Sequence, residues 1–243
     1  MVRLSKRLQA VADFVPPGCR PVDVGTDHAY LPIYLVQVGK ADEALAADVR
    51  EGPLERAKAH IARAGLEDHV HTRLSDGLSA ISPQDGDVLI LAGMGGMLTI
   101  RILRGGDISG FRMLVLAPQS DLASLREALR EMNLRIAKET LVQEDGKYYP
   151  VLCVVHGPDA DMDPVRMQYG KQLVPQARET MLRYLRTERE NLLAAISQIT
   201  SNAAGHEAAG ERLKTLQMQL RLNEEAQRRV RQENAWNEAS EFR

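Results

Sequence analysis

The chain has 243 residues, of which 44% are hydrophobic, and its 31 Lys and Arg nearly balance its 33 Asp and Glu, giving a formal net charge of -2. This length allows one large domain and an appendage, and the charge excludes a uniformly basic nucleic-acid-binding protein. Cys19 and Cys153 lack partners at metal-ligand spacing, which argues against zinc and against a disulfide framework. The apolar run 88–100 is too short to cross a bilayer, and the N-terminus has no signal-peptide core, so we expect a cytoplasmic protein that binds no membrane and no metal.

A short amphipathic helix is predicted ahead of the first strand. Leu4, Leu8, Val11 and Val15 fall on one helical face. Basic side chains cluster around this helix and are candidate contacts for RNA phosphates: Arg3, Lys6 and Arg7.

Short β-branched apolar runs then alternate with helical patterns, which is typical of βαβ units and a parallel sheet. The last apolar stretch, 135–157, reads as two strands around a Glu-Asp-Gly-Lys turn, and such a pair is antiparallel. Within it, Tyr148 and Tyr149 are assigned to core packing. The sequence therefore predicts an α/β fold with a mostly parallel sheet and an antiparallel final strand. The five parallel strands are expected at 21–25, 43–49, 69–74, 87–93 and 112–118.

The composition changes after the Pro, Gly and Asp-rich stretch 156–164, so we expect one domain over 1–160 and a second over 161–243. Two heptad patterns in the second domain predict a C-terminal α-helical coiled-coil hairpin, with caps and glycines between the helices. Polar Asn223 and Gln227 on the second pattern predict weaker pairing towards the C-terminus. A monomeric hairpin is preferred, and a coiled coil between two chains is the alternative. The heptad positions are Leu182, Leu185, Arg189, Leu192, Ile196 and Ile199, then Leu213, Leu216, Leu220, Asn223, Gln227 and Val230.

The loop after the first strand, Gly25-Thr26-Asp27-His28-Ala29, lacks the glycines that hold a pyrophosphate. The carboxylate of Asp27 would also repel a phosphate. S-adenosylmethionine carries no phosphate but has a sulfonium and an ammonium, so a loop with one glycine and nearby carboxylates suits it better. Asp48 stands near the offset at which an acidic residue contacts ribose hydroxyls, and Asp76 could accept from an adenine amine. Capping of a helix is the alternative role for each aspartate.

Three glycines follow the fourth strand in the motif "AGMGG". Gly93, Gly95 and Gly96 remove side chains where the sheet edge would face a methyl donor, and a flat base could approach the bare backbone there. Close packing of a helix N-terminus on the sheet is the alternative explanation.

The motifs "LSKRL", "DVGTDHAYLP", "AGMGG" and "EDGKYY" occur in this order ahead of the predicted coiled coil. In this respect the whole chain resembles the bacterial tRNA adenine-22 N1-methyltransferases. Where that family commonly has Gln-Pro-Asn after the fifth strand, this chain has Ala117-Pro118-Gln119-Ser120, and Gln119 is the candidate substitute.

The resemblance implies a class I S-adenosylmethionine-dependent methyltransferase fold, Rossmann-like, with S-adenosylmethionine as cofactor and tRNA as partner. It implies methyl transfer to N1 of an adenine at position 22. Asp27 is the candidate for stabilising the positive charge that develops on the base, with His28 as its helper and Tyr30 stacking on the base. Gly95, Gly96 and Gln119 join the basic residues of the first helix as candidate substrate contacts. The candidate cofactor contacts are Asp23, Gly25, Asp48, Val49, Ser75, Asp76, Gly77, Ala92, Gly93 and Met94.

Other functions stay open from the residues alone. A methyltransferase acting on another RNA would need the same crevice, and a non-catalytic RNA-binding module could use the same nucleotide-binding fold. An NAD-dependent oxidoreductase is disfavoured by the absence of the pyrophosphate motif.

Overall fold

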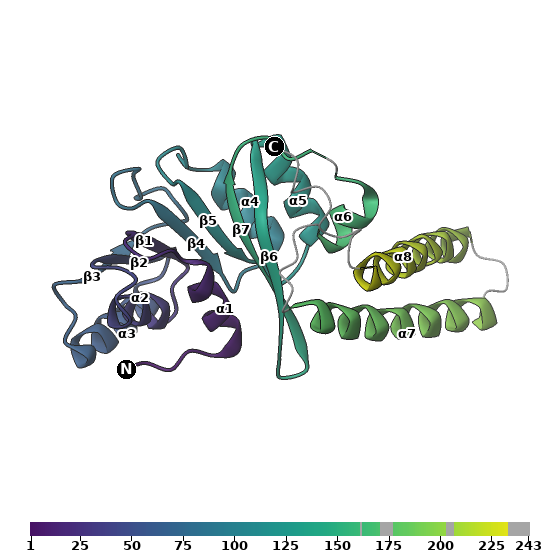
Figure 1. The fold of residues 1–243 in the computed structure, drawn as a ribbon, viewed down its shortest axis with the longest axis horizontal. Coiled ribbons are helices and arrows are strands. Elements are labelled where there is room, and N and C mark those ends of the chain that lie inside the picture. The colour runs from purple at the N-terminus through teal and green to yellow at the C-terminus, as the bar shows by residue number, and fades with distance from the viewer. Residues whose placement is uncertain (161, 171–176, 203–206, 233–243) are drawn as a thin grey trace. The chain divides into compact units, whose positions relative to one another are not determined.

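The chain forms two compact units, residues 1–160 and 161–243, in the computed structural model (Figure 1). The structure describes residues 1–160, 162–170, 177–202 and 207–232. Among the helices in these ranges, none combines the length and apolar composition of a membrane span.

A seven-stranded sheet forms the centre of the first unit, with strand order β3-β2-β1-β4-β5-β7-β6. The first five strands are parallel, and β7 is antiparallel to both of its neighbours. The predicted mixed sheet with an antiparallel final hairpin is therefore confirmed. The strands are β1 (Pro21–Val24), β2 (Ala44–Asp48), β3 (Val70–Leu74), β4 (Val88–Ala92), β5 (Met113–Ala117), β6 (Leu134–Glu144) and β7 (Lys147–His156).

Alternating side chains of the buried strands point to opposite faces of the sheet, and each face is covered by helices. Val22 and Leu89 belong to the core packed against α4 and α5. Val88 and Ile90 belong to the core packed against α1 and α2 on the opposite face, where α3 also lies. Figure 1 shows these two helical layers with the sheet between them. The helices are α1 (Lys6–Phe14), α2 (Tyr30–Gln37), α3 (Glu51–Ala64), α4 (Gly96–Arg104) and α5 (Leu122–Glu131).

The β6–β7 turn consists of Asp145 and Gly146, whose φ angles are 49° and 73°. Positive φ at both central residues is what a tight hairpin turn requires, and Asp-Gly adopts it readily. This turn brings β7 back between β5 and β6, so that the long hairpin closes the sheet on that side.

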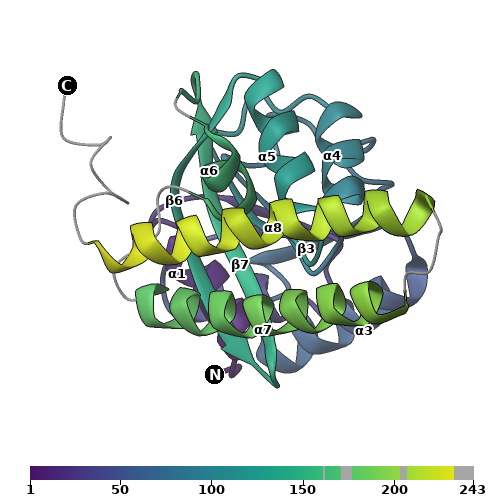
Figure 2. The same cartoon turned by 90° about the vertical axis from the view of Figure 1, so that its right-hand side faces the viewer.

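The second unit contains the two long helices of the predicted hairpin, α7 (Arg178–Asn202) and α8 (Glu207–Arg231), and a short helix, α6 (Pro164–Tyr169). Figure 2 shows α7 and α8 side by side. They are antiparallel, because Asn223 Nδ2 donates to the Leu185 carbonyl at 2.9 Å while Arg178 Nε, at the start of α7, donates to the Val230 carbonyl at 2.8 Å. The predicted connection between the helices falls partly on residues 203–206, outside the described residues.

A partly buried polar cluster joins α6, α7 and α8. The Glu188 carboxylate accepts from Tyr169 Oη at 2.6 Å, Tyr184 Oη at 2.9 Å and Asn223 Nδ2 at 2.8 Å, and Gln227 Nε2 donates to Asn223 Oδ1 at 2.8 Å. Asn223 and Gln227 are both buried. The polar groups of these two residues are therefore satisfied across the helix interface, and weaker pairing towards the C-terminus stays a prediction.

Candidate functional site

A cleft with a volume of about 620 Å³ lies at the carboxyl ends of β1, β4 and β5. The chain leaves β1 towards β2 on one side and returns to β4 on the other, and ligands of open α/β sheets bind at such a switch point. Residues 3–11, which include the start of α1, form one wall. The lining residues are Arg3, Leu4, Ser5, Arg7, Leu8, Val11, Asp23, Gly25, Thr26, Asp27, Tyr30, Leu31, Ala92, Gly93, Ala117, Gln119 and Tyr149.

The loop after β1 turns sharply at Gly25, whose φ is 80°. The amides of Gly25 and Thr26 both donate to the Ala47 carbonyl, at 2.8 and 2.9 Å. A Cβ at position 25 would lie 2.8 Å from Met94 Cε, so glycine satisfies both the backbone conformation and the available space. Met94 itself does not line the cleft but packs against the core beneath this loop.

Asp23 lines the cleft from within β1, and its side chain is almost fully buried. Burial raises the pKa of the Asp23 carboxyl to about 6, and the neighbouring Asp48 carboxylate adds to the shift. The Thr26 hydroxyl counteracts the shift without forming a hydrogen bond of normal geometry. A buried carboxylate in a cleft, destabilised by a second one, is electrostatically suited to a cationic ligand.

Asp27 extends from the same loop, and 71% of its side chain is exposed. Its Oδ1 lies 3.2 Å from His28 Nε2 and 3.5 Å from Arg56 Nη2. The ring of His28 stacks on the ring of Tyr30 with 5.3 Å between centroids. Asp27 and Tyr30 line the cleft, whereas His28 does not, so His28 contacts the two candidate catalytic residues from behind.

The glycines of "AGMGG" have different surroundings. Gly93, with φ of 84°, lines the cleft, and a Cβ there would have 4.0 Å to its nearest neighbour, Gln119 Nε2. Gly95 and Gly96 do not line the cleft. A Cβ at Gly95 would lie 3.0 Å from Ser120 Oγ, and one at Gly96 would lie 2.6 Å from the Ser120 carbonyl oxygen. Space for a base beside the backbone, as predicted, is therefore present at Gly93. Gly95 and Gly96 instead allow the loop after β5 to pack closely against the backbone.

Replacing Gly96 with alanine is expected to lower the free energy of unfolding by about 1–3 kcal/mol, because the new Cβ forces backbone of the 120–121 loop to move. Urea unfolding followed by circular dichroism measures the change. Gly52→Ala is the matched control, since a Cβ there meets only Arg56 Nη1 at 3.9 Å and alanine favours the helix α3. A Gly96→Ala protein as stable as Gly52→Ala would contradict the packing role.

The candidate cofactor residues after β2 and β3 lie outside the lining of this cleft. Asp48 is buried and accepts a hydrogen bond from the Arg50 amide at 2.9 Å, a local turn contact just ahead of α3 rather than a helix cap. Ser75 is also buried, and its hydroxyl donates to the Gly77 carbonyl at 2.9 Å. Val49 and Asp76 are exposed beside these strand ends.

Two of the three basic residues predicted to contact RNA near the N-terminus line the cleft, and one does not. Arg3 and Arg7 line the cleft, and the Arg7 guanidinium lies 5.4 Å from the centroid of the Tyr149 ring. Lys6 does not line the cleft; its amide donates to Glu144. Tyr149 is half-buried and lines the cleft, so its assignment to core packing is wrong.

Comparison with known proteins relates this chain to a family. Residues 4–152 match the family described as "Methyltransferase domain". A curated Bacillus subtilis (strain 168) protein named tRNA (adenine(22)-N(1))-methyltransferase is 35% identical over 230 residues, covering 92% of this chain and 97% of the relative. The chain belongs to this family.

Solved structures of tRNA (adenine(22)-N(1))-methyltransferases share the fold of this family member. The structure of a putative tRNA (m1A22) methyltransferase from Streptococcus pneumoniae in complex with S-adenosyl-L-methionine has a TM-score of 0.81 and 31% identity, covering 93% of this chain and 100% of that one. The structure of M. capricolum TrmK in complex with S-adenosyl-homocysteine has a TM-score of 0.74 and 26% identity, covering 90% and 98%. The predicted class I methyltransferase fold and family are thereby confirmed.

The cleft of this family member has features that fit such a ligand. Thr26 is only 2% exposed and lines the cleft, yet its Oγ1 has no hydrogen-bond partner among the described residues. An orphaned buried hydroxyl indicates a polar group that a ligand would satisfy. The buried Asp23 carboxylate suits a cation, and Gly25 and Gly93 leave room beside the backbone. In the described ranges, no group of three or more His, Cys, Asp or Glu side chains is arranged to hold a metal ion.

The sequence analysis gave no role at the cleft to Thr26 or Tyr149, and it did not predict the contact between Arg56 and Asp27. Thr26 stands within the predicted cofactor loop, and its position beside Gly25 is a signal that could have identified it. Tyr149 reaches the cleft only because β7 inserts beside β5, which a sequence pattern does not announce. Arg56, half-exposed on α3, contacts Asp27 but resembles any surface arginine in the sequence.

Proposed function

We propose that this chain transfers the methyl group of S-adenosylmethionine to N1 of adenine 22 of tRNA, as a cytoplasmic monomer that needs no metal ion. The observation that supports this most is the cleft itself. It combines a buried carboxylate at Asp23, an exposed carboxylate at Asp27, bare backbone at Gly93 and an arginine rim. The named relatives of this family act on the same nucleotide.

When bound, S-adenosylmethionine supplies an electrophilic methyl group on a sulfonium, together with an ammonium group. Asp23 and the Thr26 hydroxyl would contact its polar part, with Gly25 and Gly93 leaving space for it. The exposed Val49 and Asp76, after β2 and β3, are proposed to contact its base end.

Adenine N1 is unprotonated at neutral pH, so the protein has to orient the base and exclude water and needs no strong base. Tyr30, 38% exposed at the cleft, is proposed to stack on the base. Methylation places positive charge on the N1 and N6 region of the ring. The Asp27 carboxylate would stabilise this charge, and Gln119 would hydrogen-bond to an edge of the base.

N1 lies on the Watson–Crick edge of the base, so adenine 22 must be exposed before it can react. The second unit, residues 161–243, is proposed to help hold the tRNA while the first unit carries out the transfer. Arg221, Arg228 and Arg231 are exposed on α8 and are candidates for phosphate contacts.

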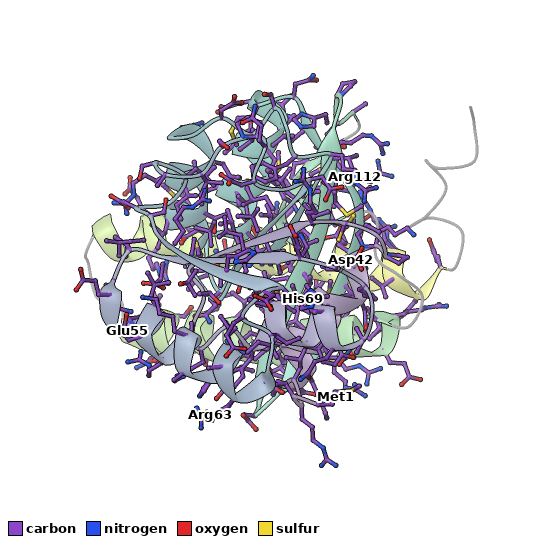
Figure 3. The ribbon with its side chains drawn as sticks, turned by 90° about the vertical axis from the view of Figure 1, so that its left-hand side faces the viewer. Met1, Asp42, Glu55, Arg63, His69 and Arg112 are labelled. Carbon is purple, nitrogen blue, oxygen red and sulfur yellow. The ribbon has the colours of Figure 1, made fainter. Side chains whose placement is uncertain are left out.

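Replacing both Arg3 and Arg7 with alanine is expected to weaken tRNA binding and to reduce the slope of log affinity against log salt concentration by about 1–2. The two guanidinium groups lie at the cleft, where the backbone around a bound nucleotide would pass. Filter binding at several salt concentrations measures both quantities. Arg63→Ala is the control, since Arg63 is exposed at the far end of α3 (Figure 3). Equal slopes for the double variant and the control would remove these arginines from the interface.

Incubation of the protein with unmodified bacterial tRNA and labelled S-adenosylmethionine, followed by mapping of the modified nucleotide, tests the proposed function. Label is expected at N1 of adenine 22, and a transcript with guanine at that position should stay unlabelled. Label at another position or only in another RNA would identify a different acceptor. Binding of tRNA without transfer to any RNA would favour the non-catalytic alternative.

A further inference from the structure

Three aromatic rings stack together beside Asp27. His28 and Tyr30 come from the loop after β1 and the start of α2, and His60 comes from α3. The ring centroids of His60 lie 5.0 Å from those of both His28 and Tyr30, with interplanar angles of 21° and 26°. His60 does not line the cleft, and no role in the preceding mechanism uses it.

The loop that carries Asp27 has a strained backbone. His28 and Ala29 adopt φ angles of 66° and 55°, in the left-handed region that residues with a Cβ avoid. Two such residues in succession persist only when neighbouring contacts hold them there. The orientation of Asp27 and Tyr30, on either side of this pair, therefore depends on what holds the turn.

His60 makes the contact that can hold it. His60 Nδ1 lies 3.1 Å from the His28 carbonyl oxygen. A carbonyl oxygen can only accept, so Nδ1 must carry the hydrogen and donate it. The ring of His60 also packs against the ring of His28, within the strained pair, and against the ring of Tyr30, which follows the pair. From His28, Nε2 reaches Asp27 Oδ1 at 3.2 Å, which completes a connection from α3 to the cleft carboxylate.

We infer that His60 is a positioning residue for methyl transfer, which holds the left-handed turn at His28 and Ala29 and thereby orients Asp27 and Tyr30 towards the acceptor base. This inference rests on the proposed function for the reaction that it affects. His60 touches neither ligand, so its loss should alter the rate of transfer rather than the affinity for S-adenosylmethionine.

Three substitutions separate the hydrogen bond of His60 from its ring. His60→Ala removes both, His60→Phe keeps a ring without the donor, and His60→Asn keeps an N–H donor near the position of Nδ1. His60→Ala is expected to lower the single-turnover rate of methyl transfer by about 10-fold to 100-fold, as misplacement of a catalytic group does. His60→Asn should recover most of the rate, and His60→Phe should not. The Kd for S-adenosylmethionine should stay within about twofold of the wild-type value in all three variants, a smaller change than the loss of one hydrogen bond to the ligand would cause.

His69→Ala is the matched control for these variants. His69 Nδ1 also lies 2.9 Å from a backbone carbonyl, that of Asp42, at the exposed start of β3 (Figure 3). This substitution should leave the transfer rate unchanged. A wild-type rate for His60→Ala, or no recovery with His60→Asn, would overturn the inference.

Amide hydrogen exchange of Ile33, whose amide donates to the Ala29 carbonyl at 3.0 Å, tests the same inference in the RNA-free protein without the reaction. Exchange in His60→Ala is expected to be about fivefold faster or more, from the loss of one hydrogen bond, and recovery is expected with His60→Asn. Unchanged exchange would overturn the positioning role. If wild-type protein methylates no tRNA, the proposed function fails, whereas the exchange measurement still decides whether His60 holds the turn.

Discussion

Replacing Asp27 with asparagine is expected to lower the single-turnover rate of methyl transfer by about 100-fold or more, which is the size of effect seen when one preorganised group that stabilises transition-state charge is lost. Asparagine has the same shape but no negative charge, so the positive charge forming on the base loses its counter-charge. The side chain is 71% exposed, so the fold should tolerate the change. Rapid-quench measurement with saturating tRNA and cofactor isolates the transfer step.

Two measurements distinguish this role of Asp27 from others. Calorimetry should give a cofactor affinity close to that of the wild type, because Asp23 rather than Asp27 is the buried carboxylate of the cleft. Asp42→Asn, at an exposed position outside the cleft, should keep the wild-type rate (Figure 3). If Asp27→Asn transfers methyl groups at the wild-type rate, the proposed stabilisation is wrong. A large loss of cofactor affinity would instead assign Asp27 to the cofactor.

Replacing Asp23 with asparagine is expected to change stability and cofactor binding in opposite directions. Burial raises the Asp23 pKa from 3.8 to about 6, so the folded protein holds this proton more tightly than the unfolded chain does. Protonated Asp23 therefore stabilises the folded protein. This contribution is fully present below pH 3.8 and is lost as the pH rises to about 6, where the carboxylate becomes charged in the folded protein. Above that range Asp23→Asn should therefore be more stable than the wild type, by on the order of 2 kcal/mol.

Binding of S-adenosylmethionine should be weakened by the same substitution. A cationic ammonium or sulfonium beside Asp23 favours the ionised carboxylate, so wild-type affinity for S-adenosylmethionine should rise as the pH passes through about 6. Asp23→Asn should bind about 10-fold to 100-fold more weakly at pH 8, as expected for the loss of a charge-assisted hydrogen bond. The affinity of Asp23→Asn for S-adenosylmethionine should also show no rise as the pH passes through about 6. Calorimetry at pH 5 and pH 8 compares the two proteins, and a pH step that survives the substitution would point to another group.

Much of the fold follows from local patterns. The strands were predictable because their apolar runs are short, β-branched and separated by helical periods, and the Asp145-Gly146 turn fixes the final hairpin. The candidate loop after β1 could be located because Gly25 and Asp27 replace the usual phosphate-binding glycines. These signals depend on neighbours in the sequence, and the sheet then brings the loops together at one edge.

The rest of the candidate site depends on contacts between distant segments. Gly96 is required by the backbone of Ser120, and no local pattern distinguishes that requirement from space for a ligand. The left-handed turn at His28 and Ala29 contains no glycine, so no local pattern predicts strain there or a partner on α3. The burial that raises the pKa of Asp23 arises because β1 lies between β2 and β4 and packs against α2, which a single strand pattern cannot reveal.

The polar cluster around Glu188 limits how the two long helices can be matched. If α8 slid along α7 by one heptad, Leu216 or Val230 would face Glu188 in place of Asn223, and the partly buried Glu188 carboxylate would lose one of its three donors. A shift by one heptad is therefore penalised, while apolar contacts alone would tolerate it. The few polar side chains between the helices thus set the alignment of the hairpin. Leucines at these positions would make the hairpin more stable but would specify its alignment less well.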